Sequence, residues 1–121
     1  MPRLYIIGPV TGIPEENLPA FLAAQEELDS LGYVTTVPHE LVRSDATHNE
    51  AMIMSINVLT DYDPVVYEVP PRIRPFYGGV ALLDGWEQSE GARTEKLVAE
   101  ACGIPVKTVA EWIEEAAHGG C

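Results

Sequence analysis

The sequence predicts a small α/β domain in which a parallel sheet of about four to five strands carries helices on both faces. Three observations support this prediction: short apolar runs recur along the chain, amphipathic segments with helical spacing separate them, and glycine or proline ends most runs. Strands that are apolar throughout are typical of parallel sheets covered on both sides. With right-handed crossovers, the result is a doubly wound, flavodoxin- or Rossmann-like sheet in a single domain over residues 1–121.

The first half of the chain predicts two strand–helix units. They are a strand at Leu4–Ile7, a helix capped by Asn17 and ended by Gly32, a strand at Tyr33–Val37, a polar loop at His39–Asn49, and a helix marked by Met52, Ile53, Ile56 and Leu59. Asparagine is a good N-cap and glycine a common helix stop, which sets the bounds of the first helix. The β-branched run before Pro38 favours the second strand.

The second half predicts two more units. They are a strand at Gly79–Leu83, a helix that begins at Ser89 or Glu90 and runs to Cys102, a strand at Ile104–Lys107, and a final helix after Thr108. Thr108 and Glu111 have the spacing of a capping box, which favours a helix start there. We expect Cys102 to belong to the core and the chain to fray at Gly119-Gly120 and Cys121.

Charge excludes several classes of partner. The chain has 19 Asp and Glu against 7 Lys and Arg, a formal charge of −12, which disfavours nucleic-acid duplexes and anionic membranes. No apolar run in the sequence approaches the ~18 residues that a membrane-spanning helix needs. The two cysteines are too few to form a metal site or a disulfide framework. His39 and His48 lack metal-ligand spacing and are interpreted as surface residues or as residues that anchor a loop. We therefore expect an intracellular, reducing environment and no metal or organic cofactor.

Two segments follow predicted strands at the edge where doubly wound sheets bind ligands: Gly8–Gly12 and Asp84–Glu95. Glu95 lies about one turn into the third helix, where the helix dipole favours an ionised carboxylate. Such a carboxylate can attack an anomeric carbon and form a covalent glycosyl intermediate. The simpler interpretation, an exposed helix glutamate, remains open.

Several motifs resemble the small nucleoside 2-deoxyribosyltransferase-like proteins, many of which are encoded by phages and prophages. These motifs are Tyr5–Gly12 (YIIGPVTG), Asn17, Pro19–Phe21, Leu31–Tyr33 and, above all, Leu82–Glu95 (LLDGWEQSEGARTE). The resemblance covers roughly residues 4–63 and 79–107. The second of the two long motifs is the specific one, whereas the first alone is a weak signal.

The resemblance implies a chemistry and a role for particular residues. Glu95 matches the nucleophile, which attacks C1′ of a 2′-deoxynucleoside or its 5′-monophosphate and displaces the base, and Tyr5 is a match for the residue that orients it. Ser89 matches a serine that binds the sugar or a 5′ phosphate, although it is also a plain helix N-cap. The remaining expected substrate-binding residues are Gly8, Pro9, Thr11, Gly12, Trp86 and Gly91. For the glycines an ordinary tight turn, and for Trp86 packing on the sheet edge, are equally good interpretations.

The chain departs from the family pattern at three places. Met54 and Ser55 stand where relatives usually have an Arg-Asp pair whose aspartate is often catalytic. Asp84 replaces a proline and can protonate the leaving base, or it is simply a turn aspartate. The third departure is an insertion at about 63–78, with four prolines, a candidate strand at Val65–Val69 and two arginines. We expect an extra hairpin or a long excursion there.

Arg72 and Arg74 flank Ile73, so an extended chain places both guanidinium groups on one side. They are expected to pair with carboxylates of a second subunit, to reach over the cleft toward a 5′ phosphate, or to be solvated.

Three hypotheses for function follow. The first is an enzyme that cleaves or exchanges the N-glycosidic bond, a transferase or a glycosidase acting as a hydrolase, in nucleotide metabolism. The second is a catalytically silent nucleotide-binding protein of the same fold, which Ser55 favours. The third is an interaction protein that uses the insertion as its contact surface. In each case we expect a cytoplasmic homodimer or higher homo-oligomer, in the host cytoplasm if the protein is phage-encoded.

Overall fold

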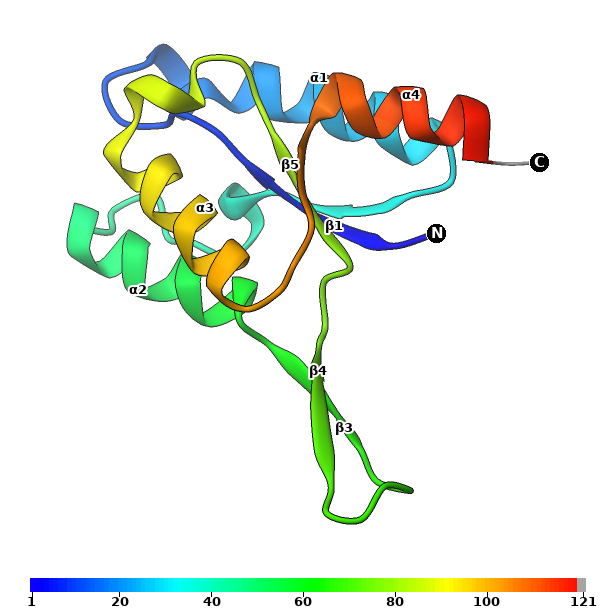
Figure 1. Cartoon of the computed structure of the whole chain (residues 1–121). Helices are drawn as coiled ribbons and strands as arrows, with labels where there is room; N and C mark the ends of the chain where they lie inside the picture. Colours follow the sequence, from blue (N-terminus) through cyan, green and yellow to red (C-terminus); the bar gives the residue numbers. More distant parts are fainter. Residues whose placement is uncertain (120–121) are drawn as a thin grey trace.

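The sheet in the computed structural model is parallel and has the order β2-β1-β5-β6 within the described residues, 1–119 (Figure 1). Its strands are β1 (Arg3–Ile7), β2 (Val34–Thr36), β5 (Gly79–Leu82) and β6 (Val106–Thr108). β1 contains the predicted run and adds Arg3, β2 and β5 lie within their predicted runs, and β6 begins two residues later than predicted. The expected fraying does not begin at Gly119, which is still the last residue of the final helix, and Gly120 and Cys121 lie outside the described residues.

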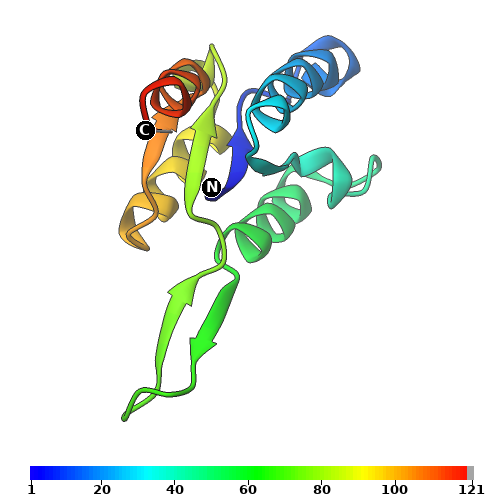
Figure 2. The ribbon, with the colours of Figure 1, turned by 90° about the vertical axis from the view of Figure 1, so that its right-hand side faces the viewer.

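Helices cover both faces of the sheet, as predicted for a small doubly wound, Rossmann-like fold (Figure 2). They are α1 (Leu18–Ser30), α2 (His48–Leu59), α3 (Glu90–Ala101) and α4 (Val109–Gly119). Side chains alternate along β1, so Leu4 and Ile6 belong to the core under α1 and α4, whereas Tyr5 and Ile7 belong to the core under α2 and α3. Since every residue from Leu4 to Ile7 is buried, β1 is apolar throughout.

Capping residues set the starts of three helices. The Thr108–Glu111 capping box is present as predicted, and Ser89 Oγ accepts a hydrogen bond from the Ala92 amide at 3.2 Å. α2 begins at His48, four residues earlier than its apolar pattern indicates. Thr47 and Glu50 form a second capping box there, with bonds of 3.0 and 3.2 Å.

Cys102 is exposed, so the prediction that it belongs to the core is wrong. α3 ends at Ala101, and Cys102 occupies the C-cap position just before Gly103, whose φ of 74° reverses the chain. The side chain therefore points away from the helical face that packs on the sheet.

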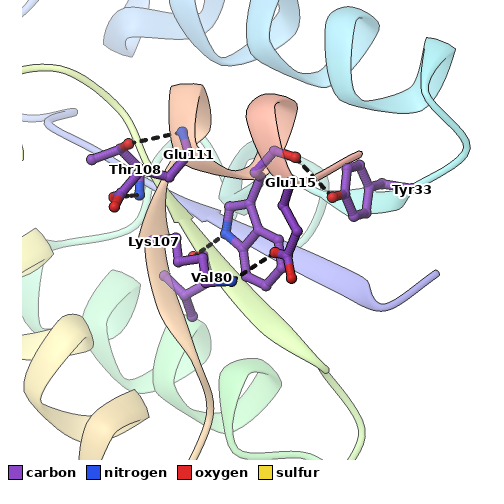
Figure 3. A network of polar contacts seen from close by, with 7 residues as sticks. Tyr33, Val80, Lys107, Thr108, Glu111 and Glu115 are labelled. Atoms are coloured by element: carbon purple, nitrogen blue, oxygen red, sulfur yellow. Dashed lines mark hydrogen bonds and ion pairs between the residues drawn. The ribbon is translucent and has the colours of Figure 1, made fainter. Parts of the chain in front are cut away.

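A polar network, buried at Trp112 and exposed at its Lys107–Glu115 pair, fastens α4 to the sheet on the face away from α2 and α3 (Figure 3). The indole Nε1 of Trp112 donates to the Val80 carbonyl at 2.8 Å, and the Tyr33 hydroxyl donates to the Trp112 carbonyl at 2.8 Å. The Lys107 ammonium pairs with Glu115 at 2.6 Å and lies over the indole. These contacts satisfy the polar groups that accompany a buried tryptophan.

Residues 62–75 form an antiparallel hairpin of β3 (Tyr62–Val65) and β4 (Arg72–Pro75) that projects from the body (Figures 1 and 2). The candidate strand Val65–Val69 is therefore wrong except at its first residue, because Val66–Val69 belong to the turn. The hairpin lies at the amino ends of the parallel strands: its Arg74 and Pro75 line a small hollow together with Arg3, Val34 and Gly78.

Candidate functional site

A cavity of about 850 Å³ opens at the carboxyl ends of β1 and β5. The chain leaves β1 toward α1 and β2 on one side, and leaves β5 toward α3 and β6 on the other, so the two loops diverge at this point. Such a switch point is where doubly wound sheets leave a crevice for a ligand. The N-terminal turns of α2 and α3 also line the cavity.

Seven predicted site residues lie on the wall of this one cavity: Gly8, Pro9, Thr11, Gly12, Ser89, Gly91 and Glu95. They come from the two segments that sequence reasoning singled out, which face each other across the crevice. Tyr5, Asp84 and Trp86 do not line it.

Glu95 is the buried carboxylate of the site. It lies in the second turn of α3, is only 8% exposed, and its Oε2 has no hydrogen-bond partner within residues 1–119. Burial raises the pKa of Glu95 to about 7, and hydrogen bonding by the Ser55 hydroxyl opposes part of that rise. The ionising effect expected from the helix N-terminus is therefore outweighed by burial. Near neutral pH this side chain exchanges between a protonated and an ionised form.

Tyr5 lies beneath the cavity and reaches Glu95 through Ser55. Its hydroxyl donates to Ser55 Oγ at 3.3 Å, and both residues are buried. Burial, followed by the nearby Glu95 carboxylate, raises the pKa of Tyr5, so the phenol remains a neutral donor. Because Ser55 Oγ accepts from Tyr5, its own proton is free to point toward Glu95.

Asp84 and Trp86 lie on the loop after β5 but away from the cavity wall. Asp84 is exposed, and Gly85, with φ of 86°, turns the chain after it. Trp86 packs against the core under α3, and the Lys96 ammonium lies 5.3 Å from the centre of its ring. The placement of Trp86 agrees with the packing interpretation of this residue.

Sequence reasoning missed two histidines of the cavity. His39 and His48 both line it, one after β2 and one at the start of α2. His39 Nε2 donates to the Glu16 carbonyl at 2.7 Å, while its buried Nδ1 has no partner within the described chain. The predicted topology could have indicated these histidines, because the segment after β2 reaches the same edge of the sheet as the loops after β1 and β5.

A left-handed turn holds the first loop. Glu15, Glu16 and Asn17 have φ values of 57°, 56° and 59°, which non-glycine residues rarely adopt. Asn17 precedes α1 as predicted, but its side chain does not cap the helix. Instead its Nδ2 donates to the Pro9 carbonyl at 2.9 Å and ties the turn to the cavity wall.

Gly8 is needed for packing as well as for the cavity. A Cβ at this position would lie 2.8 Å from the Cβ of Leu83, so we expect Gly8→Ala to lower the free energy of unfolding by about 1–3 kcal/mol. Gly12→Ala has open space and should lower it only by about 1–2 kcal/mol, through its φ of 81°. Urea denaturation measures both, and a Gly8→Ala variant as stable as the wild type would contradict the close approach.

No helix within residues 1–119 has the length and apolar character needed to span a membrane. Over the same residues, no three His, Cys, Asp or Glu side chains are grouped so as to bind a metal ion.

Comparison with known proteins finds one family. A family model described as a domain of unknown function, DUF4406, matches residues 2–68 and 74–108, which is most of the chain. The unmatched interval falls in the hairpin turn and at the start of β4. No curated protein and no solved structure gives a significant match.

Proposed function

The chain belongs to the DUF4406 family, and we propose that this member cleaves or exchanges the N-glycosidic bond of a 2′-deoxynucleoside or its 5′-monophosphate. The observation that carries the proposal is Glu95, a buried carboxylate on the wall of a cavity, with one oxygen that has no partner in the described chain. A buried polar atom without a partner calls for an explanation, and a catalytic role is one of those that such atoms commonly have. The resemblance of residues 82–95 to nucleoside 2-deoxyribosyltransferase-like proteins implies the reaction that such a carboxylate performs.

The reaction has two steps. An ionised Glu95 oxygen forms a bond to C1′ while the C1′–N bond breaks, and the electron pair leaves with the base, which takes up a proton. Water or a second base then attacks C1′ and releases the carboxylate. Hydrolysis or transfer results, according to which nucleophile enters.

The leaving base needs a proton donor near the cavity. Asp84 is an unsuitable donor because it lies off the wall, whereas the imidazoles of His39 and His48 line it. Histidine is the side chain most often used for general acid catalysis. We assign proton donation to His48 rather than to Asp84, because the Nε2–H of His39 already donates to the Glu16 carbonyl.

Two helix N-termini favour an anionic or strongly polar part of the substrate. α2 and α3 both begin at the cavity, where backbone N–H groups and Ser89 can bind phosphate or sugar oxygens despite the chain's charge of −12. Because Glu16 and Glu90 also line the cavity, these donors support binding of the sugar or of a 5′ phosphate without a preference between nucleoside and monophosphate.

The rate of base release is expected to rise as pH passes through about 7, and to fall again once the group that protonates the leaving base is no longer protonated. Only the ionised form of Glu95 is a nucleophile, and its pKa is about 7. Initial rates with a saturating monophosphate measure this profile. A profile with no rising limb near pH 7 would contradict a nucleophilic role for the ionised Glu95 carboxylate.

A panel of deoxynucleosides and their 5′-monophosphates, incubated with the protein and assayed chromatographically for free base, tests the proposal. Release of base supports it.

The second candidate function is a catalytically silent binding protein. Ser55 favours this candidate, because it places a neutral hydroxyl beside Glu95 where the resemblance predicts a carboxylate. Ligand binding by calorimetry without base release would favour that candidate and overturn the enzyme.

A further inference from the structure

The register of the β3–β4 hairpin sorts its side chains into two unlike faces. Directly opposite residues of an antiparallel pair share a face, and neighbours along a strand alternate. One face carries Tyr62, Pro64, Ile73 and Pro75, and the other carries Asp63, Val65, Arg72 and Arg74. The first set, which we name the apolar hairpin face, contains no polar side chain except the tyrosine hydroxyl.

The protein itself leaves the apolar hairpin face uncovered. Tyr62 is 57% exposed and Ile73 is 67% exposed, and neither belongs to a core cluster. The adjoining turn adds Val66, Tyr67 and Val69, which are also exposed. An isolated two-stranded hairpin is only marginally stable in water, so this arm needs a surface that covers it. Contiguous exposed apolar side chains commonly mark a protein interface.

The net charge of the hairpin indicates which partner covers the apolar hairpin face. Residues 62–75 contain two acids, Asp63 and Glu68, and two arginines, Arg72 and Arg74, so the hairpin is formally neutral on a chain of charge −12. Two copies of this chain repel each other elsewhere but can meet through the neutral hairpin. A basic partner would be drawn to the acidic body rather than to this arm.

We propose that two copies of this chain dimerise by packing their apolar hairpin faces together across a two-fold axis. The same patch serves both copies, as an isologous interface requires, and two small sheets pack face to face in the manner of a sandwich. Arg72 and Arg74 then lie on the outer face, where Glu68 is within 3.8 Å of Arg72. The hairpin is at the edge opposite the cavity, so Arg72 and Arg74 do not reach over their own cleft and both cavities stay open.

Light scattering coupled to size exclusion, over a range of micromolar concentrations, tests the dimer. The wild type is expected at twice the chain mass and Ile73→Glu at the chain mass. Ile53→Glu is the matched control, since Ile53 on α2 is 62% exposed against 67% for Ile73, and it should remain dimeric. So should the double variant Arg72→Ser with Arg74→Ser. A monomeric wild type overturns the proposal and leaves the face to a different partner; a dimeric Ile73→Glu also overturns it.

Hydrogen exchange provides a readout that does not depend on a variant. Amides of residues 62–75 should gain protection in the wild type as concentration rises, while amides of β1 should not change. The same hairpin amides should stay fast in Ile73→Glu, with the far-UV circular dichroism of the body unchanged. A dimer whose hairpin exchanges equally fast at all concentrations would place the interface elsewhere and refute the proposal.

Discussion

Glu95→Gln is expected to reduce base release by a factor on the order of a thousand or more while the fold and ligand binding persist. The amide has the shape of the carboxylic acid but cannot form the glycosyl bond. The other two carboxylates that line the cavity within residues 1–119, Glu16 and Glu90, are exposed rather than buried in its wall. Single-turnover assays of free base, with binding measured separately by calorimetry, separate the loss of chemistry from a loss of affinity.

Glu100→Gln is the control for that experiment. Glu100 lies on the same helix and makes an exposed pair with Lys96, outside the cavity, so its replacement should leave base release unchanged. An acid-labile adduct on a peptide containing residue 95, found by mass spectrometry in the wild type and absent from Glu95→Gln, would establish the nucleophile. Undiminished release by Glu95→Gln would refute the mechanism.

The same variant is expected to be more stable than the wild type above neutral pH. The pKa of Glu95 is about 7 in the folded protein against 4.5 for an ordinary glutamate, so folding favours the protonated form. Its contribution to stability is fully present below about pH 4.5 and is lost as pH rises through about 7. Glutamine does not titrate. The gain in free energy of unfolding should grow from about 1 kcal/mol at pH 5.5 to about 3 kcal/mol at pH 8.

Urea denaturation of both proteins across this pH range measures that gain as a difference, which cancels the titration of the other acidic groups. A gain of the same size at both pH values would indicate a packing effect rather than the titration of Glu95. A variant that loses stability at pH 8 would show that the ionised carboxylate has a stabilising partner. This test requires no substrate, so it can succeed even if the proposed reaction is wrong.

Local signals explain why most of the fold could be predicted from the sequence. The buried run Leu4–Ile7 and the Thr108–Glu111 box each determine their own structure through residues a few positions apart. The start of α2 is also determined locally, by the capping box of Thr47 and Glu50. The apolar pattern of that helix begins four residues later and therefore predicts a later start. The hairpin strands could not be placed, because Val65–Val69 alternates well on its own while pairing with β4 selects Tyr62–Val65 instead.

The site was predictable to the extent that topology controls it. Ligands bind at the carboxyl ends of the strands in such sheets, and from this rule Gly8, Ser89 and Glu95 were predicted to lie at one site, as they do. Side-chain direction does not follow from that rule, so Asp84 and Trp86 follow the same strand yet lie off the wall. The hydrogen bond from Tyr5 to Ser55 joins residues fifty positions apart, and no pattern within either segment indicates it.

β1 lies in the middle of the sheet although it precedes the other three strands of this sheet in the chain. One of its edges pairs with β2, but the other must wait for β5, where Gly79 lies opposite Leu4. A growing chain that has not yet reached Gly79 therefore exposes an unpaired strand edge made of apolar residues, the kind of template on which chains aggregate. Pairing over such sequence distances also slows folding. During synthesis the chain is therefore most exposed to aggregation before β5 is available to cover the free edge of β1.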